Sequence, residues 1–418
     1  MTLTDTRSES GHRPQLPRTD ISDAALKRVR AELATTAEEH DRSAAFPWAG
    51  IQVLHDAGLL RLGIGPAHGG EVLTATDGVR VFEALGQGDP SVALIAAMTV
   101  FQHAHQASAP WWPDELYDQV VRTSGHRPVL LNAVRAEPEW GAPARGGLPA
   151  TKIRQHGDSW VINGRKGFAT GSEGLDYHLV WVATDEEDPL LAHAIVPGDA
   201  PGIEIIKTWD HLGMRATSTH DVVYTDVDIP LANFRGTRLS QAAPPSFPGA
   251  TGLAVSALYV GVARAAQAFF LKFAHDRVPT SLGRPIATTE RIQSVAGEIE
   301  AQLVGAEEIL LGLAARFDAG DPSAPERASV AKLLTSRAAI SAVETAVAAI
   351  GNPALTRSHP LERHLRDVLG SRPHPPQDDA ALLIAGRAAL ARATSSTTPP
   401  TTAATPAAPV PTVPGDRP

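Results

Sequence analysis

A short β-rich block lies between two long helical regions, and this order constrains the fold more than any other feature of the chain. Between residues 128 and 235, short β-branched runs are separated by Gly, Pro, Asp and Asn, as is typical of strands joined by turns. The runs are SWVING, HLVWVAT, AHAIV, GIEII and HDVVYTDVDI. The pattern predicts an antiparallel sheet domain, which we place at residues 128–240.

Both flanks of this block have apolar residues at the three- and four-residue spacing of amphipathic helices. On the N-terminal side, segments such as SDAALKRVRAELATTAEEH and WAGIQVLHDAGLL predict a helical domain over residues 21–127. On the C-terminal side, three long Ala/Leu-rich stretches predict a helical bundle over residues 241–392. The expected fold class is therefore mainly α, with a central β-domain.

The two ends of the chain are predicted to be disordered. Residues 1–20 are polar, and residues 393–418 form a Thr/Pro/Ala tract that begins ATSSTTPPTTAATP. Such a tract cannot bury enough apolar surface to offset the entropy lost on ordering. We therefore exclude both ends from the expected fold.

Composition removes several classes of function. The formal net charge is −9, so a concentrated basic surface for nucleic acid or for an anionic membrane is not expected. The chain has no cysteine, which excludes disulfides, thiolate nucleophiles and cysteine metal sites. The N-terminus has no apolar signal-peptide core, and no run is expected to be long enough to span a membrane. We expect a cytoplasmic protein that acts on a small molecule.

Five local motifs resemble those of the acyl-CoA dehydrogenase superfamily, in the family's order. They are LHDAGLLRLGIGPAHGGE, LGQGDPSVAL, AEPEWGAP, DSWVINGRKGFATG and WDHLGMRATSTHDVVYTDVDIP. Nearer the C-terminus, Arg366–Asp367 and Arg387 fall on the family's own Arg-Asp pair and helix Arg. The resemblance implies an N-terminal helical domain, a middle β-domain and a C-terminal four-helix bundle.

The resemblance also implies a bound flavin, FAD or alternatively FMN. By this resemblance Ala136, Glu137, Phe168, Ala169 and Thr170 line the flavin ring, and the Thr170 hydroxyl is a partner for ring atom N5. The family has Thr or Ser at the position of Ala136, so one hydrogen bond to the ring is expected to be missing here.

A second implied contact comes from a neighbouring subunit. The segment DRVPTSLGRP matches the place where a family Arg reaches the FAD pyrophosphate of another copy. Arg277 is the first choice and Arg284 the second, because guanidinium groups suit phosphate oxygens. The resemblance therefore implies a homotetramer or a homodimer.

The sequence departs from the family at the catalytic carboxylate. A thioester dehydrogenase needs a base to remove the α-proton while hydride passes to the flavin. The two positions where the family carries this Glu are occupied here by Pro375 and, approximately, Thr251. Asp378 and Asp379 are nearby, but they also suit the N-terminus of a helix, where carboxylates are favourable.

His374, next to Pro375, is the candidate catalytic residue. Reduced-flavin monooxygenases on this scaffold carry a His at the corresponding place, where it can assist oxygen activation and proton transfer. An imidazole that titrates near neutrality suits that work. By contrast, the pairs His103/His105 and His359/His364 have spacings that diverge on a helix, so no metal site is expected.

Three functions stay open from sequence. The first is a two-component monooxygenase that takes reduced flavin from a separate flavin reductase and hydroxylates a small organic substrate. The second is an acyl-thioester dehydrogenase with a non-standard base, such as Asp378 or a water. The third is a catalytically silent flavin-binding scaffold.

Overall fold

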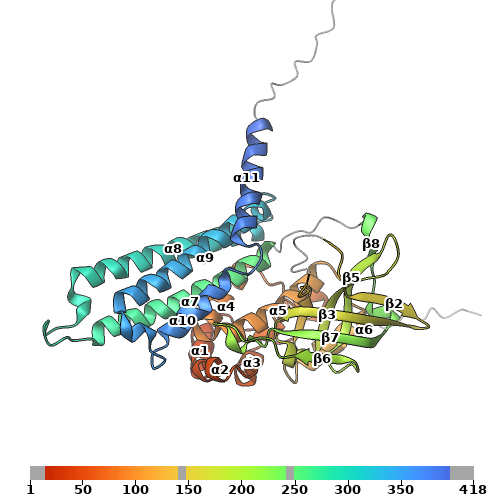
Figure 1. Cartoon of the computed structure of the whole chain (residues 1–418), viewed down its shortest axis with the longest axis horizontal. Coiled ribbons are helices and arrows are strands. Elements are labelled where there is room, and N and C mark those ends of the chain that lie inside the picture. The colour runs from red at the N-terminus through yellow and green to blue at the C-terminus, as the bar shows by residue number, and fades with distance from the viewer. Residues whose placement is uncertain (1–14, 140–146, 242–248, 396–418) are drawn as a thin grey trace, which may run out of the picture.

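The computed structural model describes residues 15–139, 147–241 and 249–395, and these form helices, then a sheet, then helices again (Figure 1). Capping residues begin the first helices, because their side chains satisfy backbone N–H groups that have no partner within the helix. The Ser22 hydroxyl accepts the Ala25 N–H, and the Asp89 carboxylate accepts those of Ser91 and Val92. The N-terminal helices are α1 (Asp23–Ala34), α2 (Ala37–Ser43), α3 (Trp48–Asp56), α4 (Ala75–Gly88), α5 (Pro90–Ser108) and α6 (Asp114–Ser124).

The middle of the chain forms a mixed eight-stranded sheet with the order β6-β7-β3-β2-β4-β5-β8, and β1 pairs with β4. Most pairs are antiparallel, as expected, but β1 and β2 each pair with β4 in parallel. The strands are β1 (Leu131–Val134), β2 (Lys152–His156), β3 (Ser159–Ala169), β4 (Tyr177–Ala183), β5 (Leu190–Pro197), β6 (Ile203–Ile206), β7 (His220–Pro230) and β8 (Thr237–Arg238).

Three long helices form the C-terminal bundle: α7 (Gly249–Asp276), α8 (Glu290–Asp318) and α9 (Ala324–Ile350). Each packs on the other two, and the short helix α10 (Leu361–Val368) packs on α7 and α9. The first residues of the last helix, α11 (Asp378–Ser395), contact α9, and the rest of α11 projects away from the body of the molecule (Figure 1). The predicted fold class is confirmed.

The N-terminal and C-terminal helices cross closely where α4 meets α7. Glycines on both helices allow this approach, since a Cβ on Gly86 would lie 2.1 Å from the Leu258 carbonyl oxygen. A Cβ on Gly261 would likewise lie 2.1 Å from the carbonyl oxygen of Glu83. One hydrophobic core runs through this crossing and continues under the sheet, joining Phe82 on α4, Leu258 on α7 and Val222 on β7.

Two helices pass a length and hydropathy test for membrane spans, which corrects the expectation that no run would do so. The windows in α7 and α9 have mean hydropathy 1.5 and 1.4. These apolar windows are 72% and 44% buried inside the fold, so packing between helices accounts for much of their apolar character.

Both predicted ends differ from the structure at their inner margins. Residues 15–20, predicted to be disordered, are held to the body by the Leu16 N–H, which donates to the Gly69 carbonyl, and by the Thr19 hydroxyl, which donates to that of Gly58. At the other end, α11 continues to Ser395, into the predicted tail. The remainder of both predicted segments lies outside the described residues.

Candidate active site

An irregularity near the end of β3 presents an aromatic ring to solvent. The pairing of β3 with β7 shifts register between Lys166 and Ala169, as expected of a β-bulge. Within the bulge Phe168 has a left-handed φ of 54°, which is strained for a bulky residue, and its side chain is 60% exposed. Strain of this kind is concentrated at functional sites, and the ring offers a flat apolar surface beside the sheet.

A chain of hydroxyl groups lies beside this bulge. Thr170 is buried, and its Oγ1 accepts a hydrogen bond from Thr219 Oγ1 at 3.2 Å. Thr219 Oγ1 is also 2.7 Å from Thr217 Oγ1, which donates to the Met214 carbonyl. Because hydroxyls both donate and accept, this chain can hydrogen bond the polar edge of a heterocycle placed against Phe168.

Glu137 anchors the loop on the other side of the bulge instead of offering a free carboxylate. It accepts hydrogen bonds from Lys166 Nζ at 2.7 Å, from the Thr151 hydroxyl and from the backbone N–H groups of Thr151 and Ala150. Burial alone would raise the pKa of Glu137, but these donors outweigh it and the net shift is downward. The adjacent Ala136 carbonyl accepts the Gly167 N–H at 2.9 Å, which fixes the loop next to Phe168.

His374 is hydrogen bonded to a tyrosine that sequence reasoning missed. Its Nε2 lies 2.8 Å from the hydroxyl of Tyr259, which is 1% exposed on α7. Burial, with a smaller contribution from the charge of Lys332, lowers the pKa of His374 to about 4. The expectation that this imidazole titrates near neutrality is therefore wrong, because its surroundings disfavour the charged form.

The His374–Tyr259 pair and the bulge meet around Met214 and Gly370. A Cβ built on Gly370 would lie 3.0 Å from both Met214 Cγ and the Tyr259 hydroxyl. Met214 is in turn linked through its carbonyl to Thr217, the end of the hydroxyl chain just before β7. The fold thus brings residues more than 100 positions apart in sequence into one region between the sheet and α7.

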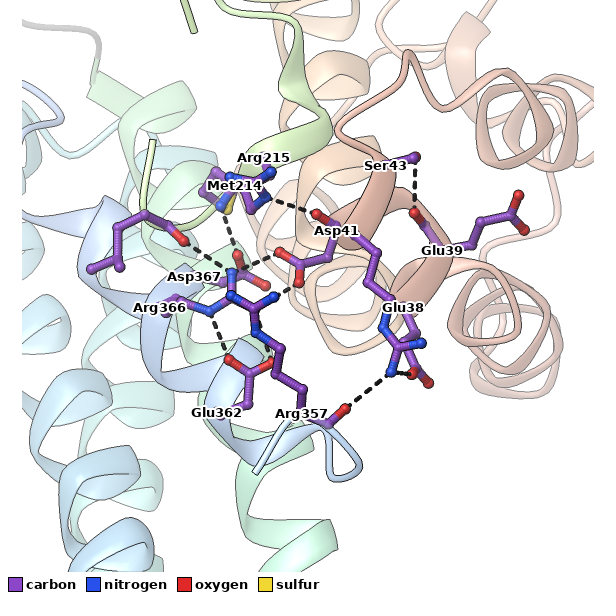
Figure 2. A network of polar contacts seen from close by, with 12 residues as sticks. Glu38, Glu39, Asp41, Ser43, Met214, Arg215, Arg357, Glu362, Arg366 and Asp367 are labelled. Carbon is purple, nitrogen blue, oxygen red and sulfur yellow. Dashed lines mark hydrogen bonds and ion pairs between the residues drawn. The ribbon is translucent and has the colours of Figure 1, made fainter. Parts of the chain in front are cut away.

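The Arg-Asp pair of α10 fastens this region to the N-terminal helices (Figure 2). The Asp367 carboxylate accepts the Met214 N–H at 2.6 Å and is 3% exposed, and burial raises its pKa to about 7. Arg366 forms a two-pronged ion pair with Asp41 of α2 and a second ion pair with Glu362. These residues position the 209–215 loop, and Asp367 is closed off from solvent.

The carboxylates nearest to His374 in sequence are not free bases. Asp378 pairs with Arg337 at 3.0 Å, and Asp379 is exposed in the first turn of α11. Thr251 lies in the first turn of α7, and Pro375 has no side-chain base. Neither position expected of the family's Glu therefore carries a carboxylate, and the polar pair nearest in sequence to Pro375 is His374 with Tyr259, whose phenol pKa is raised by burial.

Arg277 and Arg284 lie far from this region within one chain. Both are exposed in the turn between α7 and α8, at the end of the bundle away from the sheet (Figure 1). The structure therefore does not bring them together with Phe168 and His374, and their predicted contact depends on a second copy.

The residues present fit a flavin ring. The strained, exposed Phe168 gives a stacking surface, and the buried Thr170–Thr219 hydroxyls give hydrogen-bonding groups beside it. His211, whose ring centroid is 6.4 Å from that of Phe168, extends the aromatic surface. A flavin held there would supply redox chemistry that none of these side chains can supply.

Comparison with known proteins agrees with this fit. The chain matches the N-terminal, middle and C-terminal domains of acyl-CoA dehydrogenase at residues 18–107, 133–227 and 253–374. YdbM of Bacillus subtilis, which bears the name of an acyl-CoA dehydrogenase, is 33% identical over 85% of this chain and 93% of its own.

Solved structures with different names share the fold. Butyryl-CoA dehydrogenase of Megasphaera elsdenii superposes with a TM-score of 0.78 at 22% identity, covering 90% of this chain and all of that one. FMN-bound TdsC of Paenibacillus sp. A11-2 has the same TM-score and identity, over 88% of this chain and 97% of its own. Family profiles along all three domains, together with a relative one-third identical over nearly its whole length, show that the chain belongs to the acyl-CoA dehydrogenase family of flavin-dependent oxidoreductases.

Proposed function

We propose that the chain is a monooxygenase that uses reduced flavin from a separate flavin reductase to hydroxylate a small organic substrate. The observation that supports this most is the neutral His374–Tyr259 pair, hydrogen bonded at 2.8 Å, beside the position where a dehydrogenase carries its Glu. The flavin is FAD or FMN, and the FMN-bound structure of TdsC on this fold supports the second choice.

The proposed hydroxylation balances in atoms, electrons and protons. Reduced flavin, when bound, supplies two electrons to molecular oxygen, so that one oxygen atom enters the substrate and the other leaves as water. Two protons are consumed with that water. As a hydrogen-bonded pair of neutral groups, His374 and Tyr259 each offer a proton donor or acceptor at the site, and neither carries a charge before the reaction. Phe168 would position the ring, and the Thr170–Thr219 hydroxyls would orient its polar edge.

A second candidate is an acyl-thioester dehydrogenase that uses another base. The 33% identical relative named as an acyl-CoA dehydrogenase supports it. This reading requires Asp378 to leave Arg337, or a bound water to remove the proton, because Pro375 cannot.

The first experiment separates the two. Protein loaded anaerobically with reduced FAD is mixed with oxygenated buffer in a stopped-flow spectrometer, and oxidised protein is mixed in parallel with a panel of acyl-CoA thioesters. We expect a transient absorbance distinct from both reduced and oxidised flavin, and no bleaching by thioesters. Bleaching by a thioester, with direct return to oxidised flavin in oxygen, would favour the dehydrogenase.

Two variants test the role of His374 and Tyr259 in the proposed reaction. His374→Ala and Tyr259→Phe should each shorten the transient and divert electrons to hydrogen peroxide, while flavin affinity stays near that of the wild type. An unchanged transient in both variants would remove the pair from the mechanism.

We also propose that the working protein is a homotetramer or homodimer. The separation of Arg277 and Arg284 from the ring site supports this, because these residues can contact a flavin phosphate only from another copy. The exposed leucines of α11 supply a further reason: Leu382, Leu383 and Leu390 are 52%, 54% and 72% exposed on a helix that projects from the body.

A further inference from the structure

A polar cavity of about 400 Å³ borders the region assigned to the flavin ring at His211, and Phe168, Thr170, Tyr259 and His374 are not among its lining residues. Its walls come from α2, from the 209–215 loop, and from α10 with the loop that precedes it. Leu212 and Arg357 are exposed at its rim, so the cavity is open to solvent. Its volume is in the range of small-molecule sites.

The charges of this cavity are unusual for an acidic protein. Three carboxylates line it, and five guanidinium groups outnumber them by two positive charges. The whole chain has a net charge of −9, so the excess is local. The guanidinium groups belong to Arg42, Arg215, Arg357, Arg363 and Arg366.

Three of the arginines are already engaged by the protein. Arg366 is held by Asp41 and Glu362 (Figure 2). Arg42 pairs with Glu38. Arg215 donates to the backbone carbonyl of Asp41 at 2.8 Å. The three carboxylates of the cavity therefore pair with Arg366 and Arg42. None of them pairs with Arg357 or Arg363.

Arg357 and Arg363 have no hydrogen-bond or ion-pair partner for their side chains among the described residues. Arg363 is only 9% exposed, and its Nε is buried without an acceptor. Asp367, whose pKa burial raises to about 7, attracts this guanidinium electrostatically but is not hydrogen bonded to it. A buried Nε without an acceptor is costly, because that nitrogen has lost water without gaining a hydrogen bond. An anion in the cavity would supply the missing acceptors.

We propose that this cavity binds the phosphate group of a small molecule, with the phosphate between Arg363 and Arg357. Guanidinium groups match phosphate oxygens in geometry, and a phosphate near pH 7 carries close to two negative charges, which equals the local excess. The cavity exceeds the size of a phosphate, and Leu212 and Pro360 give apolar lining for an organic remainder.

The proposal is tested by isothermal titration of the full-length protein with inorganic phosphate and with phenyl phosphate, in chloride buffer of constant ionic strength. Arg363→Met keeps most of the side-chain volume and removes the charge. Arg357→Ala changes an exposed side chain that holds no partner, so it keeps the test valid if the first variant unfolds. The matched control is Arg122→Ala, which removes one exposed charge on α6.

We expect saturable binding that weakens about tenfold or more in each cavity variant and is unchanged in the control. Absence of binding for both probes, or equal binding in all three variants, would overturn the proposal. Tighter binding of phenyl phosphate than of inorganic phosphate identifies an organic phosphate as the ligand, whereas equal binding identifies free phosphate.

A flavin arm distinguishes a third source of the phosphate. FMN and riboflavin are titrated into the wild type and into Arg357→Ala. Selective loss of FMN affinity shows that the cavity holds the phosphate end of the flavin, and equal affinities show a ligand separate from it. Neither result depends on whether the protein reacts with oxygen, so the site is tested independently of the proposed reaction.

Discussion

Lys166 is 0% exposed, and the ion pair it forms with Glu137 ties the loop after β1 to the bulge that carries Phe168. A buried ammonium without its carboxylate is strongly destabilising, since its lost hydration is no longer offset. We expect Glu137→Gln to lower the free energy of unfolding by about 3 kcal/mol, measured by urea denaturation.

The control for this change is the exposed pair between Lys152 and Asp185, which are 3.6 Å apart. Lys152→Ala should cost less than about 1 kcal/mol. Equal losses in both variants would show that the Glu137–Lys166 pair gains nothing from its burial.

His374 gives a prediction with a defined pH window. Its pKa in the folded protein is about 4, below the ordinary value of 6.5. A group whose pKa is lowered by folding contributes stability above its unfolded pKa, and this is lost as the pH falls. The wild type should therefore lose stability relative to His374→Asn between about pH 6.5 and pH 4.

Thermal unfolding across this range measures the difference. His156→Asn, at an exposed histidine on β2, is the control and should follow the wild type. A constant difference between wild type and His374→Asn across the window would mean that the imidazole is charged as easily in the folded state as in the unfolded one.

Sequence alone reached only part of the site. Phe168 and Thr170 could be predicted as site residues because their hairpin has a local motif, which is readable without knowledge of the fold. Tyr259 was missed because its partner lies 115 residues further along the chain, and an Ala/Leu-rich helix hides one functional hydroxyl among core residues. The ion pair of Asp41 with Arg366 joins residues 325 positions apart, so it could not be predicted from the sequence either.

At the scale of elements, the α4–α7 crossing depends on small residues. A methyl group at Gly86 would lie 2.1 Å from a backbone oxygen, which no side-chain rotation can relieve. Overpacking typically costs about 1–3 kcal/mol, and a backbone clash belongs at the upper end or beyond. Gly86→Ala should thus destabilise the protein by about 3 kcal/mol in chemical denaturation.

Gly297 on α8 is the matched control. A Cβ there meets no atom within 4 Å, and alanine favours helix over glycine by about 1 kcal/mol. Gly297→Ala should therefore leave stability unchanged or raise it slightly. If Gly86→Ala also left the stability unchanged, helices α4 and α7 would have to move apart with little loss of free energy of unfolding.

The order of elements was predictable because helical periodicity and β-branched runs are local patterns. The parallel pairing of β1 with β4 was not, since LNAV and YHLVWVA carry no information on the direction in which they meet. The projection of α11 was also unpredictable, because its leucines would suit a helix packed in the bundle equally well.

The whole molecule exposes apolar side chains that a second copy would cover. Leu383 and Leu390 are seven residues apart on α11, so they lie on the same face of this helix. Leu383→Glu combined with Leu390→Glu should reduce the assembled form to a smaller species in light scattering, with the helical circular dichroism signal retained.

The control is Arg392→Glu, a charge change at an exposed position on the same helix. It should leave the mass unchanged. A wild type that is already monomeric at micromolar concentration would contradict the proposed assembly.

The continuous hydrophobic core has a consequence for how the chain comes apart. Leucines and valines of the first helices, of the sheet and of the C-terminal helices belong to one buried cluster, so each of the three regions hides apolar surface of the others. A fragment that ends at either boundary of the sheet region would therefore expose apolar surface that is buried in the whole protein, and it should aggregate rather than fold. Because the N-terminal helices, the sheet and the C-terminal helices share this hydrophobic core, thermal unfolding should occur in one cooperative step. Limited proteolysis should likewise leave no stable fragment of the described residues.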